Sequence, residues 1–168
     1  MSRQRRLEIA NETKEILHRK EYSHPTRNDE TISIASDLNA SCNGTRVLNS
    51  KTTNMWMNRN GTKGDDMSFP EITVVNATTF AAARDLIHQQ RQTMNAEFKN
   101  NSTSITEPDV CCLNFASAKH PGGGFLKGSQ AQEESLARAS GLYSCLLQAP
   151  TYYQTNKRRK KTKPYPAI

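Results

Sequence analysis

Three consecutive glycines, Gly122, Gly123 and Gly124, are followed after a spacer of seven residues by Gln132-Glu133-Glu134. A glycine triplet has no side chains to hinder a bulky ligand, and it can present successive N–H groups as an anion-binding nest. A carboxylate beside bound phosphates feels their negative charge, which favours its protonated form and suits it to general acid catalysis. The pattern therefore predicts a hydrolase that acts on a nucleotide-like substrate.

Each half of this pattern also has an ordinary structural explanation. The glycines can form a simple turn, and Glu133 and Glu134 in a first helical turn would oppose the helix dipole, an effect of roughly 0.3–1 kcal/mol. Two other nucleotide-binding motifs fail on spacing. A Walker A loop requires lysine where Ser129 stands, and the dinucleotide fingerprint requires glycine where Lys127 stands.

The periodicity of apolar residues predicts the elements that position this site. We expect helices over 3–21, 79–92 and 132–148, and strands over 31–37, 71–76 and 110–115. Thr78 or Thr79 is the expected N-cap of the middle helix. Strand, helix, strand, glycine loop and helix in this order are typical of a largely parallel sheet covered by helices, in which ligands bind beyond the carboxyl ends of the strands.

Residues 38–70 contain no clear periodicity, and a lid and a poorly ordered insertion are both open interpretations. Trp56 is expected to anchor this region to the core. The last helix of the chain is expected to turn an apolar stripe inward: Leu136, Ala139, Tyr143, Leu146 and Leu147.

Length and composition indicate one domain of 168 residues with a compact core, since only 35% of residues are apolar. No stretch approaches the roughly 20 apolar residues that span a bilayer, and the charged N-terminus lacks the centre of a signal peptide. We therefore expect an intracellular protein with no membrane partner. The four cysteines form no C-x-x-C pair, so we predict buried free thiols and no metal site.

Residues 113–138, from Leu113 to Arg138, closely resemble the motif of microbial-type poly(ADP-ribose) glycohydrolases. That motif is a glycine triplet, a spacer of six to eight residues and Gln-Glu-Glu. Leu142-Tyr143 fits the family as well, and the resemblance extends more loosely over residues 3–156.

The resemblance implies a macrodomain-like three-layer α/β/α fold with a mixed sheet. It also implies an enzyme that hydrolyses the ribose–ribose O-glycosidic bond of poly(ADP-ribose) on modified proteins and releases ADP-ribose, without metal or cofactor. Glu134 would be the general acid that protonates the departing oxygen, and Glu133 would hold the ribose hydroxyls. The remaining implied contacts are geometric support from Gln132, diphosphate binding by Gly122, Gly123 and Gly124, a ribose border at Phe125, and ribose or loop contacts from Asn114. A strand-end asparagine that satisfies backbone groups is the alternative for Asn114.

The resemblance also has a limit, because the family's chains continue well past the catalytic helix. We expect residues 1–156 to form the N-terminal part of the domain, so that the fold is C-terminally incomplete. The alternative functions are a non-catalytic ADP-ribose-binding module and a truncated remnant of such an enzyme.

Residues 157–168 are expected to form a disordered basic tail, because six of the net +7 charges fall within 157–163. Three roles remain open for this tail: a solvated terminus, a nuclear import signal read by an import receptor, and attraction to poly(ADP-ribose) or nucleic acid. The expected location is accordingly cytoplasmic or nuclear.

Overall fold

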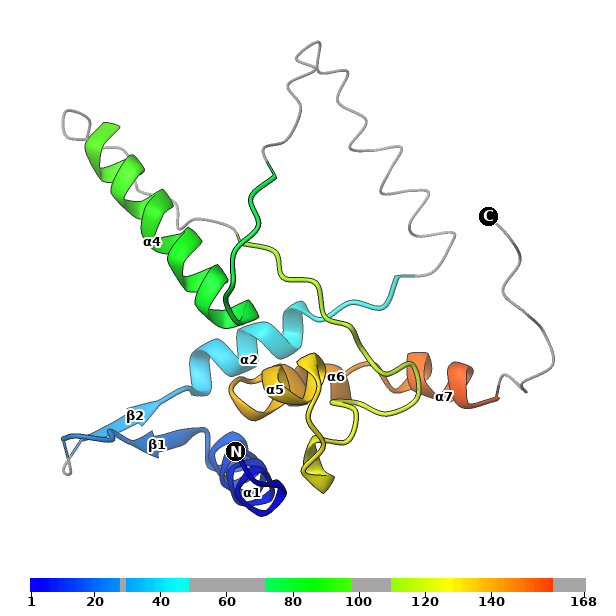
Figure 1. Cartoon of the computed structure of the whole chain (residues 1–168). Coiled ribbons are helices and arrows are strands. Elements are labelled where there is room, and N and C mark those ends of the chain that lie inside the picture. The colour runs from blue at the N-terminus through cyan, green and yellow to red at the C-terminus, as the bar shows by residue number, and fades with distance from the viewer. Residues whose placement is uncertain (28–29, 49–71, 98–109, 159–168) are drawn as a thin grey trace, which may run out of the picture. The chain divides into compact units, whose positions relative to one another are not determined.

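The computed structural model describes residues 1–27, 30–48, 72–97 and 110–158. The chain divides into two compact units, the first formed by Met1–Gly61 with Phe115–Ile168 and the second by Thr62–Asn114. The elements are shown in Figure 1. Trp56 and residues 159–168 of the basic tail lie outside the described residues, as does most of region 38–70.

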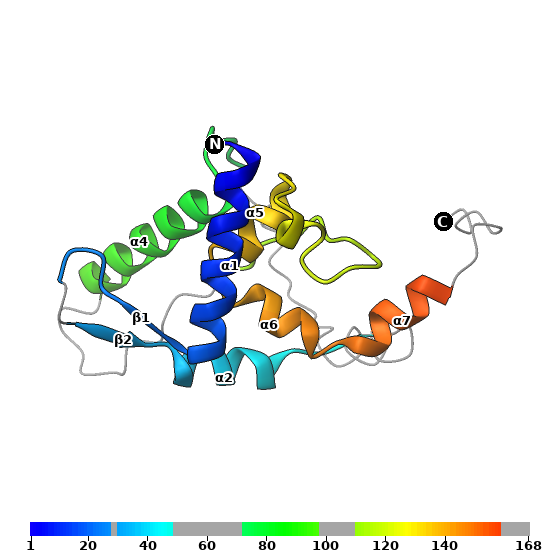
Figure 2. The same ribbon diagram turned by 90° about the horizontal axis from the view of Figure 1, so that it is seen from below.

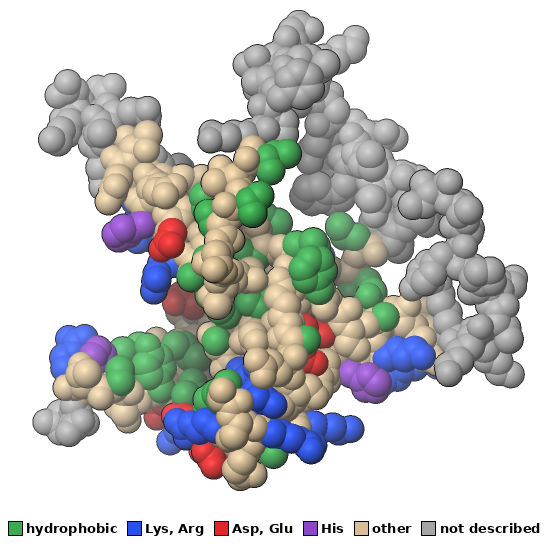
Figure 3. All heavy atoms as spheres, in the orientation of Figure 1, with side chains coloured by type: hydrophobic (Ala, Val, Ile, Leu, Met, Phe, Trp, Pro, Cys, Tyr) green, Lys and Arg blue, Asp and Glu red, His purple; other side chains and the backbone are tan. Residues whose placement is uncertain are grey.

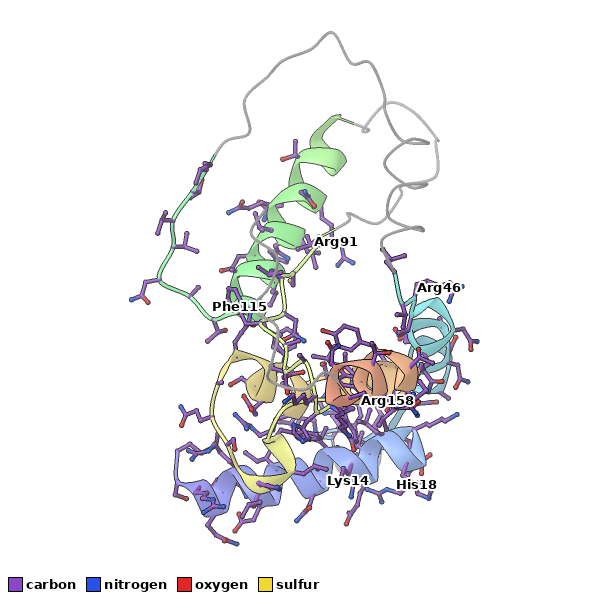
Figure 4. The ribbon with its side chains drawn as sticks, turned by 90° about the vertical axis from the view of Figure 1, so that its right-hand side faces the viewer. Lys14, His18, Arg46, Arg91, Phe115 and Arg158 are labelled. Atoms are coloured by element: carbon purple, nitrogen blue, oxygen red, sulfur yellow. The ribbon has the colours of Figure 1, made fainter. Side chains whose placement is uncertain are left out.

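The first unit begins with helix α1 (Arg3–Arg19), which confirms the predicted N-terminal helix. Ser2 caps its start, since the Ser2 hydroxyl accepts a hydrogen bond from the Arg5 N–H at 3.2 Å. Lys20 ends the helix in a left-handed conformation with φ 60°. Ala10 and Leu17 are buried, whereas Lys14 and His18 are exposed side chains of the same helix (Figure 4).

A short hairpin and a second helix follow α1. Strand β1 (Glu21–Ser23) pairs antiparallel with β2 (Thr31–Ser33), and Tyr22 faces Ile32 across the pair. The strand predicted over 31–37 is therefore right only to Ser33, because the chain turns into helix α2 (Ala35–Gly44). Leu38 lies four residues after Ile34 and is the buried residue of α2, which is helical rather than alternating spacing.

The helix predicted over 132–148 is two helices, α5 (Gln132–Arg138) and α6 (Leu142–Leu147). The break has a local cause at Ser140. Its hydroxyl donates to the Leu136 carbonyl at 2.8 Å and accepts from the Leu142 N–H at 3.2 Å, which offers the backbone an alternative to helical bonds. The predicted inward stripe is correspondingly interrupted, and Leu147 is exposed.

Helix α7 (Pro150–Arg158) ends the described chain, with proline at its first position and Tyr153 buried. It contains Lys157 and Arg158, which the sequence assigned to the tail.

The core of the first unit lies where α1, α5 and the glycine loop meet. Ala10, Phe125 and Ala137 are fully buried, and Tyr143 of α6 packs against them. The rings of Phe125 and Tyr143 meet edge to face with centroids 4.8 Å apart. Phe125 opens the short 3-10 helix η1 (Phe125–Lys127), so the glycine loop is fixed to this core by its own next residue. Figure 2 shows α1 running next to α5 in this part of the unit.

The second unit contains helix α4 (Thr79–Glu97), and its predicted cap is confirmed because the Thr78 hydroxyl accepts from the Ala81 N–H at 3.2 Å. The strands predicted over 71–76 and 110–115 are wrong within the described residues, where neither segment pairs with a strand. Ile72 and Val74 are exposed to 86% and 93%. A β-branched run gains little without a partner for its backbone groups, and the described residues supply none.

Cys111 and Cys112 are exposed in the same segment, contrary to the expectation of buried thiols. The described chain as a whole is a mixed α/β structure, mostly helical, with one two-stranded sheet. None of the described helices has the length and apolar character needed to cross a membrane.

Candidate functional site

The glycine loop is a tight turn in which Gly122 and Gly123 have φ of 68° and 59°. Its internal hydrogen bonds run from the Gly123 N–H to the His120 carbonyl at 3.0 Å and from the Phe125 N–H to the Gly122 carbonyl at 3.2 Å. The left-handed conformation at two successive positions favours glycine, because a Cβ atom there meets its own carbonyl. The loop thus has a defined shape rather than the freedom of a linker.

Gly123 sits directly over both glutamates of α5. A Cβ atom built on it would overlap Glu134 Oε1 and would lie 3.0 Å from Glu134 Cδ and 3.1 Å from Glu133 Oε2. The sequence attributed the glycines to the approach of a ligand. The structure adds a requirement internal to the protein: glycine at 123 lets the loop close onto the two carboxylates.

The two carboxylates are buried and each is held by a backbone N–H. The Gly124 N–H donates to Glu134 Oε1 at 2.9 Å, and the Ser117 N–H donates to Glu133 Oε2 at 2.7 Å. Glu133 is 2% exposed and Glu134 9% exposed. The second oxygens, Glu133 Oε1 and Glu134 Oε2, are buried and have no hydrogen-bond partner among the described residues. Buried acceptors without donors are costly, so this arrangement fits a ligand that brings hydroxyl or N–H groups.

Two of the three glycine N–H groups predicted to form an anion nest already donate within the protein in this structure, and diphosphate binding by the glycines stays a prediction. The N–H groups of Gly123, Gly124 and Phe125 all donate within the protein. The same groups cannot point toward a phosphate at the same time, because each backbone N–H is one donor. The glycine loop therefore serves first to orient the carboxylates.

Gln132 and Asn114 differ in their hydrogen bonds. The Gln132 side-chain oxygen accepts from the Phe115 N–H at 2.7 Å, which ties the start of α5 to the chain that leads into the loop. This contact suits a supporting residue, and the role of Gln132 in catalysis stays a prediction. Asn114 belongs to the second unit, is half-buried, and has no partner for its buried Oδ1 among the described residues.

Phe125 takes a different place from the one expected. A fully buried ring offers no surface to a ribose, and this ring lies under the loop, where a Cβ atom on Gly122 would be 2.9 Å from it. In this structure Phe125 supports the loop, and its role at the border of the ribose stays a prediction.

Three arginines from two helices hold the far end of the loop by its carbonyl oxygens. Arg3 and Arg6 of α1 donate to the carbonyls of Lys127 and Gly128 at 3.1 and 2.7 Å. Arg138 of α5 donates to the Ser129 carbonyl at 2.7 Å. Figure 3 shows Lys and Arg side chains gathered over α1 and the loop. Three positively charged side chains thus hold the far end of the loop.

Arg138 and Tyr153 form the electrostatic surroundings of the two glutamates. Burial lowers the pKa of the Arg138 guanidinium and Arg6 adds to this, whereas Glu134 raises it. Burial also raises the pKa of Tyr153 to about 12, and the negative charge of Glu133 contributes. Glu134 therefore has a buried cation as a neighbour, and Glu133 has a neutral phenol.

Sequence reasoning missed Ser117, Arg6, Arg138 and Tyr153. Arg138 had a usable signal, since it follows Glu134 by four residues on one helix and such residues are neighbours. Arg6 had none, because it contacts Gly128 across 122 positions of the chain. Ser117 contributes only a backbone N–H to Glu133, which no residue type announces.

Chemically, the site presents two anchored carboxylates side by side, with Gly123 against both. Each carboxylate has one oxygen without a partner in the part of the chain that the structure describes. Such a pair can accept hydrogen bonds from sugar hydroxyls and can exchange a proton with a leaving group or a water. Among the described residues there is no cluster of three or more side chains of the types that bind metals.

Comparison with known proteins places this chain in a family. The family description microbial-type PARG, catalytic domain, matches residues 10–167. The X-ray structure of poly(ADP-ribose) glycohydrolase from Thermomonospora curvata is 37% identical, with a TM-score of 0.75 and 92% of this chain covered. The same enzyme bound to the inhibitor ADP-HPD and a glutamate-to-alanine mutant of it give TM-scores of 0.72 and 0.71 at the same identity and coverage of this chain.

The chain spans about half the length of these structures, 50% of the first and 48% of the other two. No curated protein matches the chain. The family description nevertheless covers nearly the whole chain and includes the glycine loop and both anchored glutamates. This chain belongs to the microbial-type poly(ADP-ribose) glycohydrolase catalytic domain family.

Proposed function

We propose that this protein hydrolyses the ribose–ribose O-glycosidic bond of poly(ADP-ribose) and releases ADP-ribose, with Glu134 as general acid and base. The observation that carries the proposal is the buried pair Glu133 and Glu134. Each has one oxygen fixed by a backbone N–H and one without a partner among the described residues. Family membership supports the substrate class, and the inhibitor in one of the similar structures is an ADP derivative by its name.

In the proposed reaction, the protonated Glu134 gives its proton to the ribose oxygen that leaves as the glycosidic bond breaks. The positive charge that develops on the anomeric carbon is stabilised by the nearby substrate diphosphate. The Glu134 carboxylate then takes a proton from a water molecule, whose oxygen attacks that carbon, so the acid form is regenerated. Glu133 accepts hydrogen bonds from ribose hydroxyls and holds the linkage over Glu134. This scheme needs no second nucleophilic carboxylate, unlike the usual glycosidase pair.

The diphosphate would lie against Gly122, Gly123 and Gly124. Because the N–H groups of Gly123 and Gly124 already donate within the protein, the glycines contribute close approach more than hydrogen bonds. Arg6 and Arg138 are placed under the end of the loop, and their charges favour an anion on its outer side. This electrostatic part of binding should weaken as salt is added.

The test is Glu134→Gln in the full chain, assayed for release of ADP-ribose and for ADP-ribose binding by calorimetry. Turnover should fall roughly 10²–10⁴-fold because the amide cannot give up a proton, while the Gly124 N–H can still donate to the amide oxygen. Glu12→Gln on the exposed face of α1 is the matched control and should leave both measurements unchanged. Equal turnover in the wild type and the Glu134 variant would refute the proposed role.

The alternative function is an ADP-ribose-binding module without hydrolysis. The buried oxygens Glu133 Oε1 and Glu134 Oε2, which have no partner among the described residues, support binding as well, because they can accept hydrogen bonds from ribose hydroxyls without a proton transfer. Calorimetry on the wild-type chain separates the two functions. Binding of ADP-ribose without release from poly(ADP-ribose) would identify the module. Absence of both would indicate a remnant, and release would establish the enzyme.

A further inference from the structure

Two helices of the first unit bring together cysteines that are far apart in the sequence. Cys42 lies on α2 and Cys145 on α6, and both are half-buried free thiols. Helices α2 and α6 lie side by side (Figure 2). Besides burial, the neighbouring Cys145 raises the pKa of the Cys42 thiol, so the two thiols are neighbours across these helices.

A second contact between the same faces of α2 and α6 shows that the two cysteines approach each other because the helices pack together. A Cβ atom built on Gly141 at the start of α6 would be 2.8 Å from Leu38 Cδ1 on α2. Leu38 precedes Cys42 by four residues, and Gly141 precedes Cys145 by four residues. Residues four apart share a helix face, so the two helices meet at Leu38 with Gly141 and again one turn later at the cysteines.

We propose that Cys42 and Cys145 are a modification site, a dithiol that forms a reversible disulfide in exchange with a low-molecular-weight disulfide such as glutathione disulfide. One protein thiolate attacks a sulfur of the small disulfide, which breaks the small S–S bond and releases one glutathione. The second protein thiol then loses its proton and attacks the resulting mixed disulfide, which releases the second glutathione. Two protein thiols are oxidised, and one small disulfide is reduced to two thiols.

The surroundings of the pair suggest the order of attack. Burial raises the pKa of the Cys42 thiol, the neighbouring Cys145 adds to this, and Lys20 opposes it. A thiol kept in its protonated form is a poor nucleophile, so Cys42 should react slowly as the first thiol of the pair.

The disulfide would tie α6 to α2. Helix α6 carries Tyr143, whose ring packs edge to face on Phe125 and lies close to Gly122. The bond would also close a long loop of chain, and such closures restrict the unfolded state most. Oxidation should therefore raise the melting temperature.

The experiment uses the full chain with Cys111→Ser and Cys112→Ser, which removes the two exposed thiols of the second unit. The reduced protein is incubated in its folded state with glutathione disulfide, alkylated and digested without reduction. We expect a peptide that links Cys42 to Cys145 and a melting temperature raised by about 5–10 °C. A reducing agent should reverse both changes. Adding Cys42→Ser should leave one mixed disulfide at Cys145 and no rise in melting temperature.

Two results would overturn the proposal. One is an oxidised protein in which Cys42 and Cys145 each stay free or each carry a glutathione. The other is a linked peptide that appears only after unfolding in urea or that lowers the melting temperature, because the bond would then not follow from the native contact. Neither result bears on hydrolysis by Glu134, so the two proposals can fail separately.

Discussion

The glycine loop and its two glutamates are largely buried, whereas the apolar segments of the second unit are exposed. In the loop, Phe125 is fully buried and Glu133 is 2% exposed. In the second unit, Val74 is 93% exposed. The loop closes through contacts between near neighbours, such as Gly124 with Glu134 ten residues on. A strand needs a partner that its own sequence does not specify, so an equally strong pattern can remain unpaired.

The largest change in unfolding free energy is expected at the buried Phe125, in contrast to the exposed Phe115. Phe125→Ala should cost about 3–5 kcal/mol of unfolding free energy, because it empties the core between α1 and α5. Phe115→Ala should change it by no more than about 0.5 kcal/mol, since Phe115 is 74% exposed. Urea unfolding measures both, and Phe125→Leu extends the series if the alanine variant does not fold. Similar costs at the two positions would break the comparison.

Two glycines offer the next test. Gly123→Ala should cost about 2–4 kcal/mol, because the methyl group needs a left-handed backbone and collides with both carboxylates. Gly44→Ala at the end of α2 meets nothing within 4 Å and should stabilise by up to about 1 kcal/mol. Thermal unfolding of the two variants gives the contrast. ADP-ribose binding should be lost with Gly123→Ala, so normal binding there would show that the loop does not control the carboxylates.

The burial of Tyr153 should make the stability of the folded protein fall at alkaline pH. Its pKa is about 12 in the folded protein and near 10 in an unfolded chain, so the folded state holds the proton more tightly. The stability from this group is complete below pH 10 and is lost as the pH rises toward 12, by about 1–3 kcal/mol.

Urea unfolding at pH 9 and pH 11.5 tests this in the wild type, Tyr153→Phe and Tyr152→Phe. The Tyr153 variant should lose less stability between the two pH values than the wild type. Tyr152→Phe should remove only a small part of the wild-type difference, because Tyr152 comes after burial and Glu133 among the causes that raise the pKa of Tyr153. If the wild type and the Tyr153 variant fall by the same amount, the phenol is not buried beside Glu133.

The smallest effect is expected in the second unit. Val74→Ser should change the unfolding free energy by no more than about 0.5 kcal/mol, because a side chain that is 93% exposed loses little contact. Chemical denaturation measures it. A cost of about 2 kcal/mol would mean that this segment is covered in solution, and the contrast with the loop would then disappear.

The sequence predicted that the glycine loop and the two glutamates are neighbours because they are close together in the chain. The spacing of Gly123 and Glu134 carries this prediction, and the helix start at Thr78 follows from capping chemistry. The break at Ser140 was missed because a hydroxyl bond to the Leu136 carbonyl competes with a regular apolar stripe. The buried place of Phe125 depends on Ala10 and Tyr143, which come from separate helices. The cysteine pair likewise depends on the packing of α2 against α6.

The hydrogen bonds from α1 to the far end of the glycine loop have a consequence for how the protein can be produced. Arg3 and Arg6 reach the Lys127 and Gly128 carbonyls from the first two turns of the chain. Initiation of translation at an internal methionine, or trimming of the first six residues by a protease, would leave every glycine and glutamate of the site in place. Such a shortened product would nevertheless lose two of the three arginines that hold the end of the loop, and a loss of activity could then be mistaken for a defect in the acidic residues.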